Sequence, residues 1–261
     1  MSNACRKHFA LRNVSLEYNE PADFVQSQFQ CGRKLYIVWR AFWAMYHLAS
    51  IIACAFVSKN IHGETDVKWF IYLTNWSYSM LTLDVLLEFI AVVYVRKADD
   101  ILSGDYTVTP WYLKAVWVVY NVGNCSAVLV TVLYWFILYK TGVPITTTTV
   151  VVHALNSVYV ILNLPVTAVP VGIYHFFHSM VVGVVYVIFT IVYHALGGTN
   201  RHDKPYIYPQ IDWNRPGTAA MYSAGVVFVA IPLIHSLIFH VYLARVAVYN
   251  RYQRRSVDIM A

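Results

Sequence analysis

Six long, continuously apolar segments constrain the fold of this chain more than any other feature of its sequence. A helix that spans the hydrocarbon core of a bilayer needs about 20 apolar residues, because each residue advances it by roughly 1.5 Å. The runs are continuously apolar and do not alternate with period two, so they predict helices and not the strands of a membrane barrel. We place the six predicted helices at Leu35–Val57, Trp69–Val95, Leu113–Leu138, Pro144–Leu164, Tyr174–Leu196 and Gly217–Val248.

The composition also indicates a membrane protein. Hydrophobic residues make up 59% of the 261 residues and charged residues only 12%, whereas a typical soluble domain carries about 25% charged residues. A soluble chain of this length could not bury so much apolar surface in one core. We therefore expect an all-α, polytopic membrane helix bundle of about six transmembrane helices, placed in the plasma membrane or the endoplasmic reticulum.

The lysines and arginines lie mostly at the ends of the apolar segments, and their distribution predicts an orientation. If both termini are cytosolic, roughly twice as many of these residues fall on the cytosolic side as on the outer side, as the positive-inside rule requires. The predicted organisation is a cytosolic N-terminal segment (1–34), a transmembrane domain (35–248) and a basic cytosolic tail (249–261). The net charge of +6 is not gathered into basic runs with interleaved aromatics, so no nucleic-acid partner is expected. Membrane lipids, and then other membrane proteins, are the expected partners.

Polar residues interrupt the second predicted helix at positions that share one face. Ionisable groups inside a span are costly and are functional candidates by default. Arg40 in the first helix lies at a depth similar to that of Glu88 and cannot lose its proton, so it needs an anion. We therefore predict a structural ion pair of Arg40 with Glu88 or Asp84. At 100° per residue, the residues that fall within about 80° of arc on this face are Thr74, Ser77, Leu81, Asp84 and Glu88.

The fourth predicted helix carries a second polar face, formed by Thr146, Thr149, His153 and Asn156. Thr74 and His153 lie about 8 Å and 14 Å below the outer ends of their helices, a difference of about one turn. A hydroxyl becomes a good nucleophile when a base takes its proton, and histidine is the usual base. The two side chains are thus a candidate nucleophile and base facing one cavity, or alternatively a structural hydrogen bond between helices, worth roughly 0.6 kcal/mol. His175 and His178 have the spacing of a metal pair but no evident third ligand, so no metal and no cofactor are predicted.

Four stretches of the sequence resemble a known family. They are WFIYLTNW (69–76), FVQSQFQCGRKLY (24–36), HALNS (153–157) and YIYPQIDW (206–213). They resemble the rolling stone family, multipass membrane proteins named for an insect protein involved in myoblast fusion. The resemblance covers about residues 20 to 245 and implies a role in cell fusion or membrane organisation during muscle development.

A more distant resemblance implies a chemical activity. The androgen-induced and androgen-dependent membrane proteins share a Trp-x-x-x-Leu-Thr pattern in the second helix and a histidine in the fourth. In that family the threonine and histidine are the catalytic pair of an intramembrane hydrolase of fatty acid esters of hydroxy fatty acids. The resemblance implies that Thr74 and His153 take these roles here. Those hydrolases carry further threonines after the histidine, where this chain has Ala154 and Leu155, so the pocket is expected to differ.

Two residues are supporting candidates for this chemistry. Asn156 lies one turn from His153 on the same predicted face, where it would orient the imidazole or bind an oxyanion. His194, followed by Tyr208 and Pro209, resembles the fifth-helix pattern of the hydrolases and would approach from the outer end of that helix.

Three functions therefore remain open at the level of sequence. The first is a fusion factor or membrane organiser, and the second is a Thr/His lipid hydrolase. A small-molecule transporter ranks third: Asp84 and Glu88 lie near the midplane, but no internal repeat of the kind common in transporters is evident.

Overall fold

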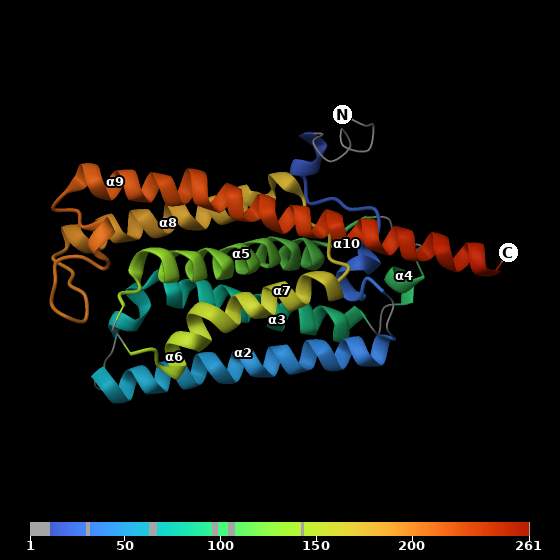
Figure 1. Cartoon of the computed structure of the whole chain (residues 1–261), viewed down its shortest axis with the longest axis horizontal. Coiled ribbons are helices and arrows are strands. Elements are labelled where there is room, and N and C mark those ends of the chain that lie inside the picture. Colours follow the sequence, from blue (N-terminus) through green and yellow to red (C-terminus); the bar gives the residue numbers. More distant parts are fainter. Residues whose placement is uncertain are drawn as a thin grey trace.

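The computed structural model describes residues 11–29, 32–62, 67–95, 99–103, 108–141 and 144–260, and six of its helices are long and apolar enough to cross a membrane. No β-strand occurs in these ranges, so the predicted all-α polytopic bundle is confirmed (Figure 1). The six spans are α2 (Arg33–His62), α3 (Leu73–Val95), α5 with η4 (Trp111–Leu133, Tyr134–Leu138), α6–η5–α7 (Thr147–Val150, Val151–Leu155, Asn156–Val166), η6–α8 (Ile173–His175, Phe176–Ala195) and α9–η8–α10 (Pro216–Gly225, Val226–Ala230, Ile231–Met260).

Short helices connect or precede these spans: η1 (Leu11–Val14), η2 (Pro21–Val25), η3 (Val67–Ile71), α4 (Asp99–Leu102) and η7 (Pro209–Ile211). Because the chain crosses the bundle six times, α2 begins and α10 ends at the same end, which we call the terminal end (Figure 1). The first turns of α3, α6 and α9 lie at the opposite end. That both ends of the chain are cytosolic stays a prediction.

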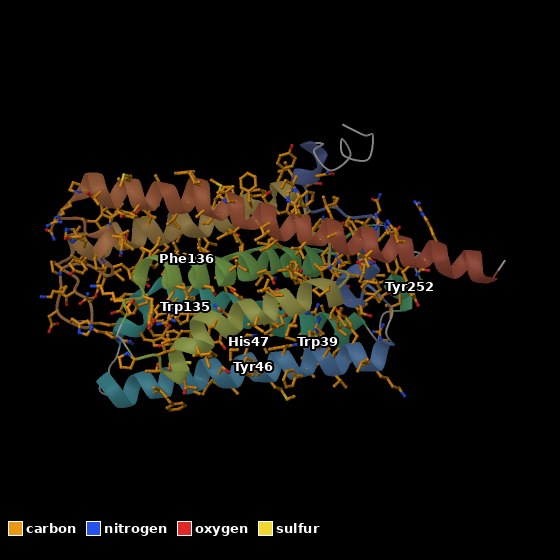
Figure 2. All side chains as sticks on the ribbon, viewed as in Figure 1. Trp39, Tyr46, His47, Trp135, Phe136 and Tyr252 are labelled. Atoms are coloured by element: carbon orange, nitrogen blue, oxygen red, sulfur yellow. The ribbon has the colours of Figure 1, made fainter. Side chains whose placement is uncertain are left out.

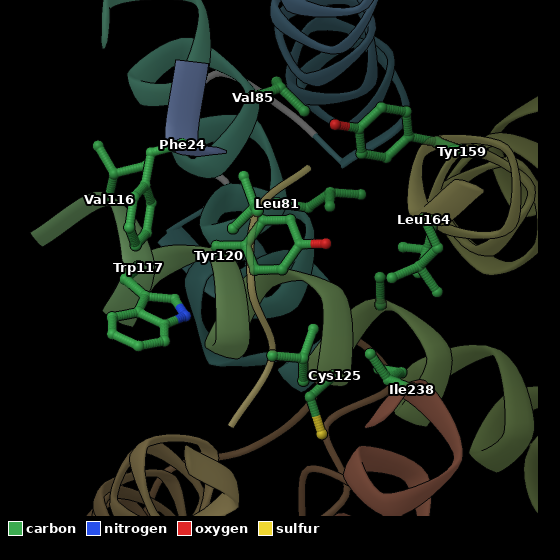
Figure 3. Packing of buried hydrophobic residues seen from close by; sticks show 14 of the residues in the cluster. Phe24, Leu81, Val85, Val116, Trp117, Tyr120, Cys125, Tyr159, Leu164 and Ile238 are labelled. Atoms are coloured by element: carbon green, nitrogen blue, oxygen red, sulfur yellow. The ribbon is translucent and has the colours of Figure 1, made fainter. Parts of the chain in front are cut away.

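The helices α3 and α5 form the centre of the bundle. In the most apolar stretch of each of these two spans, half or more of the residues are buried inside the protein. The corresponding share is 22% in α2 and 17% in the span that contains α8. Apolar side chains of the outer helices therefore point away from the protein, as expected where lipid is the solvent. The core between the central helices includes Leu81 and Val85 from α3 and Val116 and Tyr120 from α5 (Figure 3).

The described part of the N-terminal segment packs against the terminal end of the bundle. Phe24 is fully buried, and its ring meets that of Trp117 edge-on at 5.3 Å (Figure 3). The segment also pairs with the chain after α7, since Gln28 N–H donates to the carbonyl of Val166 and Ala168 N–H to that of Gln26. The turn after α7 is buried where it meets this segment.

Proline shapes the last span. Pro232 cannot donate a main-chain hydrogen bond, so the sequence predicts a kink there. In the structure a π-helical turn, η8 (residues 226–230), ends two residues before this proline, and the helix runs on through α10 to Met260 (Figure 1). The stretch 249–260, which the sequence suggested as a tail, therefore continues the last helix.

Candidate functional site

Thr74 and His153 meet at the opposite end of the bundle. Thr74 is the second residue of α3, and His153 lies in the π-helical turn η5. The Thr74 Oγ and His153 Nε2 atoms are 3.2 Å apart, and both side chains are partly buried. Two residues 79 positions apart in the chain are thus in hydrogen-bond contact, which is the geometry that a nucleophile and its base require.

The other imidazole nitrogen determines which tautomer faces the threonine. His153 Nδ1 lies 3.2 Å from the carbonyl oxygen of Thr149. A carbonyl oxygen only accepts hydrogen bonds, so Nδ1 carries the proton. In the neutral ring the lone pair is then on Nε2 and points at the Thr74 hydroxyl, which donates to it. The main chain of the same helix therefore holds the histidine as a proton acceptor.

Two π-helical turns support the imidazole. Tyr134, the first residue of η4 (134–138), stacks on the His153 ring with centroids 3.7 Å apart. Its neighbour Trp135, near the opposite end of the bundle in Figure 2, donates its indole N–H to the His153 carbonyl at 2.9 Å. A π turn displaces main-chain groups from the regular helical pattern and is frequent at functional sites. Here one such turn carries the histidine and the other fixes its ring.

An apolar cavity of about 110 Å³ adjoins Thr74. It lies between α3, α5, α8 and the last span, and the third π-helical turn of the described chain, η8, contributes Val226 and Val227 to its wall. His153 does not line this cavity, although the sequence suggested that both residues face it. The imidazole therefore reaches the cavity through its contact with the Thr74 hydroxyl. Apolar residues that line the cavity include Leu73, Leu129, Val130, Leu133, Val187 and Ile231.

Tyr208 also borders the cavity beside Thr74, and sequence reasoning gave it no role. Its hydroxyl lies close to the Thr74 side chain and to the main chain of Leu73 and Thr74 at the start of α3. Tyr208 belongs to the loop between α8 and α9, which Lys68 secures by donating to the Thr199 hydroxyl and the Asn200 carbonyl. The YIYPQIDW stretch and the resemblance of Tyr208 and Pro209 to the hydrolase pattern were the signals for this tyrosine, but neither placed it beside α3, which lies more than 130 residues away in sequence.

The two supporting candidates lie apart from the pair. Asn156 hydrogen-bonds to α5: its amide N–H₂ donates to the carbonyl of Ala127, and its Oδ1 accepts from the Thr131 hydroxyl. His194 places Nδ1 3.0 Å from the carbonyl of Pro205 in the loop after α8. In the part of the chain that the structure describes, no hydrogen bond joins either residue to Thr74 or His153. Asn156 thus connects two helices, and His194 holds the loop.

Arg40 and Glu88 are brought together in the other half of the bundle. Arg40 Nη1 lies 2.6 Å from Glu88 Oε2, with the two side chains 1% and 0% exposed. The remaining guanidinium N–H groups donate to Tyr36, Asn163 and Thr167. This network connects α2, α3 and α7 and provides the buried cation with the hydrogen bonds that it needs.

Asp84 is not part of that ion pair. Its Oδ2 accepts from the Asn124 amide at 3.1 Å, and no described cation lies within ion-pair distance of it. His47, on the Arg40 face of α2, contacts the Tyr78 hydroxyl instead of an acid. Among the described residues there is no group of three ligands that could hold a metal ion.

Comparison with known proteins places the chain in a family. Residues 1–257 match the family "Protein rolling stone". The chain is 30% identical over 247 residues to "Protein rolling stone" of Drosophila melanogaster, an alignment that covers 90% of this chain and 88% of the fly protein. No solved structure matches the chain. With its six apolar spans, the chain is therefore a multipass membrane protein that belongs to the rolling stone family.

Proposed function

We propose that this protein is an intramembrane hydrolase of lipid esters in which Thr74 is the nucleophile and His153 the base. The observation that carries the proposal is the hydrogen bond from the Thr74 hydroxyl to His153 Nε2, made while Nδ1 is occupied by the Thr149 carbonyl. A threonine that merely satisfied its own helix would donate to the preceding turn, as Thr82 does to the carbonyl of Tyr78. Thr74 lies at the start of α3 and donates across to another helix.

The reaction follows from this geometry. His153 Nε2 takes the hydroxyl proton as Thr74 Oγ forms a bond to the ester carbonyl carbon. The bond from that carbon to the alcohol oxygen then breaks, and His153 returns the proton to the departing alcohol. Water attacks the acyl-threonine with His153 again as base, the bond to Thr74 Oγ breaks, and the carboxylic acid leaves.

The cavity indicates the class of substrate. Its walls are almost wholly apolar, and Thr74 and Tyr208 supply hydroxyls at the end nearest the pair. An acyl chain in the cavity would bring its carbonyl to Thr74 without any charged recognition group. We therefore propose esters of long-chain fatty acids, including fatty acid esters of hydroxy fatty acids, in which both products are apolar enough to leave through the bilayer.

Hydrolysis by the purified full-length protein tests this proposal. With a fluorogenic long-chain fatty acid ester as substrate, Thr74→Ala and His153→Ala should each abolish turnover. Thr82→Ala and His240→Gln are matched controls, because each native side chain hydrogen-bonds to a main-chain carbonyl of its own helix. Both controls should keep wild-type rates. Equal rates in wild type and Thr74→Ala would refute the proposal.

We propose a role in cell fusion or membrane organisation during muscle development as a second candidate function. Membership of the rolling stone family favours it, and it is compatible with the hydrolase if fusion needs the lipid product. Expression of wild type and Thr74→Ala in fusing myoblasts that lack the endogenous protein separates the two. Rescue by both would assign fusion to a role independent of the pair, and rescue by wild type alone would connect fusion to its chemistry.

A further inference from the structure

We propose that Tyr208 is a catalytic residue of this site and donates the hydrogen bond that stabilises the oxyanion formed when Thr74 attacks the ester. This inference rests on the proposed hydrolase function. It adds a residue from the loop after α8, which approaches the pair from outside the spanning helices.

The placement of the Tyr208 hydroxyl is the first part of the argument. Tyr208 and Thr74 line the same cavity, and the phenol hydroxyl lies close to the Thr74 side chain. A carbonyl carbon within bonding reach of Thr74 Oγ would therefore place its oxygen near the phenol O–H. His153 lies on the other side of the threonine, outside the cavity lining. Base and proton donor thus flank the nucleophile from two directions, the arrangement that acyl transfer requires.

Main-chain amides at the start of α3 determine the direction in which this phenol donates. The first N–H groups of a helix have no partner within the helix. The N–H groups of Asn75 and Trp76 go to the carbonyl of Tyr72, and the main chain of Leu73 and Thr74 lies close to the Tyr208 hydroxyl. The phenol oxygen therefore faces donors from α3. Because the Thr74 hydroxyl gives its own proton to His153, the phenol proton is directed at Thr74 Oγ, beside the position that the substrate oxygen would take.

The main-chain amides at the start of α3 also make the Tyr208 hydroxyl a stronger hydrogen-bond donor. A helix N-terminus carries partial positive charge, and a chain of hydrogen bonds polarises each member. Negative charge on the substrate oxygen would be passed through the phenol to the positive end of α3. Burial raises the pKa of Tyr208 to about 12, so the hydroxyl keeps its proton at neutral pH.

The surroundings hold the tyrosine in this position. The Tyr72 ring meets it edge-on with centroids 5.8 Å apart, and Pro209 begins the short helix η7 directly after it. Beneath it, Tyr186 donates its hydroxyl to the carbonyl of Ile71, just before α3. A fixed donor costs little reorganisation when the charge develops, which is the source of this type of catalysis.

The test replaces only the hydroxyl, in the purified full-length protein. Tyr208→Phe should lower kcat for a fatty acid ester by about 10²- to 10³-fold, the usual loss for one oxyanion donor. Its KM should stay within about twofold of wild type, because the interaction is made mainly in the transition state. Tyr72→Phe is the matched control: its hydroxyl accepts from Arg201 N–H in the same loop, and kcat should not change.

A pair of inhibitors separates catalysis from packing. A long-chain trifluoromethyl ketone adds to the threonine and mimics the tetrahedral oxyanion, and the matching alkyl ether mimics only the bound chain. Tyr208→Phe should weaken the binding of the ketone by a factor close to the factor by which it lowers kcat. The affinity for the ether should not change. An equal loss of affinity for both inhibitors, or a kcat near that of wild type, would overturn the role of Tyr208 but not the proposed hydrolase function. A wild-type protein that hydrolyses no ester would overturn the proposed function and this inference with it.

Discussion

Arg40 and Glu88 are joined by a 2.6 Å ion pair between α2 and α3, with both side chains buried. Removal of one partner leaves an uncompensated charge in the bundle, at a cost of about 3 to 5 kcal/mol. Glu88→Leu should therefore strongly reduce the folded yield and lower the thermal transition in detergent. Arg40→Met combined with Glu88→Leu should recover part of this loss. If the losses of the two single variants simply add, the two residues are not coupled.

A second prediction concerns Gly183 on α8, which lines the cavity and leaves room in it. A Cβ at this position would meet Ile231 Cδ1 at 3.0 Å and Val227 Cγ2 at 3.3 Å, on the cavity wall. Gly183→Leu should fill the space and lower kcat/KM for long-chain esters by about tenfold or more, and short-chain esters should be affected less. Gly225→Ala, where a Cβ would meet nothing within 4 Å, is the control. A uniform loss across chain lengths would contradict an acyl chain at this wall.

A third prediction concerns pH and the N-terminal segment. Burial raises the pKa of the Asp23 carboxyl above its ordinary 3.8, and the hydrogen bond from the Tyr18 hydroxyl opposes that shift. The folded state therefore holds a proton more tightly than the unfolded state. The resulting stability is present below pH 3.8 and is lost as the pH rises through the raised folded pKa.

Asp23→Asn keeps the acceptor for Tyr18 and never ionises. It should raise the thermal transition at pH 7, with a gain that shrinks as the pH is lowered towards 4. Asp203→Asn, an exposed acid at the opposite end, is the control. A gain that did not change with pH would mean that the charge of Asp23 is not its cause.

The fourth prediction concerns orientation. The distribution of lysine and arginine predicts that both termini are cytosolic and that the loop between α8 and α9 lies outside. In intact cells, an impermeant thiol reagent should label a cysteine introduced at Lys204, and a C-terminal tag should need permeabilisation for detection. A tag accessible from outside would reverse the orientation and place the Thr74 end of the bundle in the cytosolic leaflet.

The sequence predicted the spans and two contacts between them, because both follow from hydropathy and helix geometry. The Arg40–Glu88 and Thr74–His153 proposals needed only depth and a common face. Asn156 was placed on the His153 face by assuming 100° per residue. A π turn contains more residues than an α turn, so η5 rotates Asn156 away from His153 and towards α5.

Features formed by distant segments were beyond sequence reasoning. No local pattern marks the π turn η4, whereas η8 lies just before Pro232, where the sequence predicts a kink but not its π-helical form. The contact of Tyr208 with α3 depends on a loop closed by Lys68. The burial of Phe24 depends on where the turn after α7 lies, which charge and hydropathy do not specify.

A fluorophosphonate probe reports on the Thr74 hydroxyl itself, because it forms a covalent bond with an activated hydroxyl. After treatment of the purified protein, peptide mapping should find the adduct on Thr74, with labelling lost in Thr74→Ala and His153→Ala and kept in Thr82→Ala. Absence of any adduct on Thr74 in a folded protein that binds long-chain esters would rule out Thr74 as the nucleophile and leave the threonine and histidine as a hydrogen bond between helices.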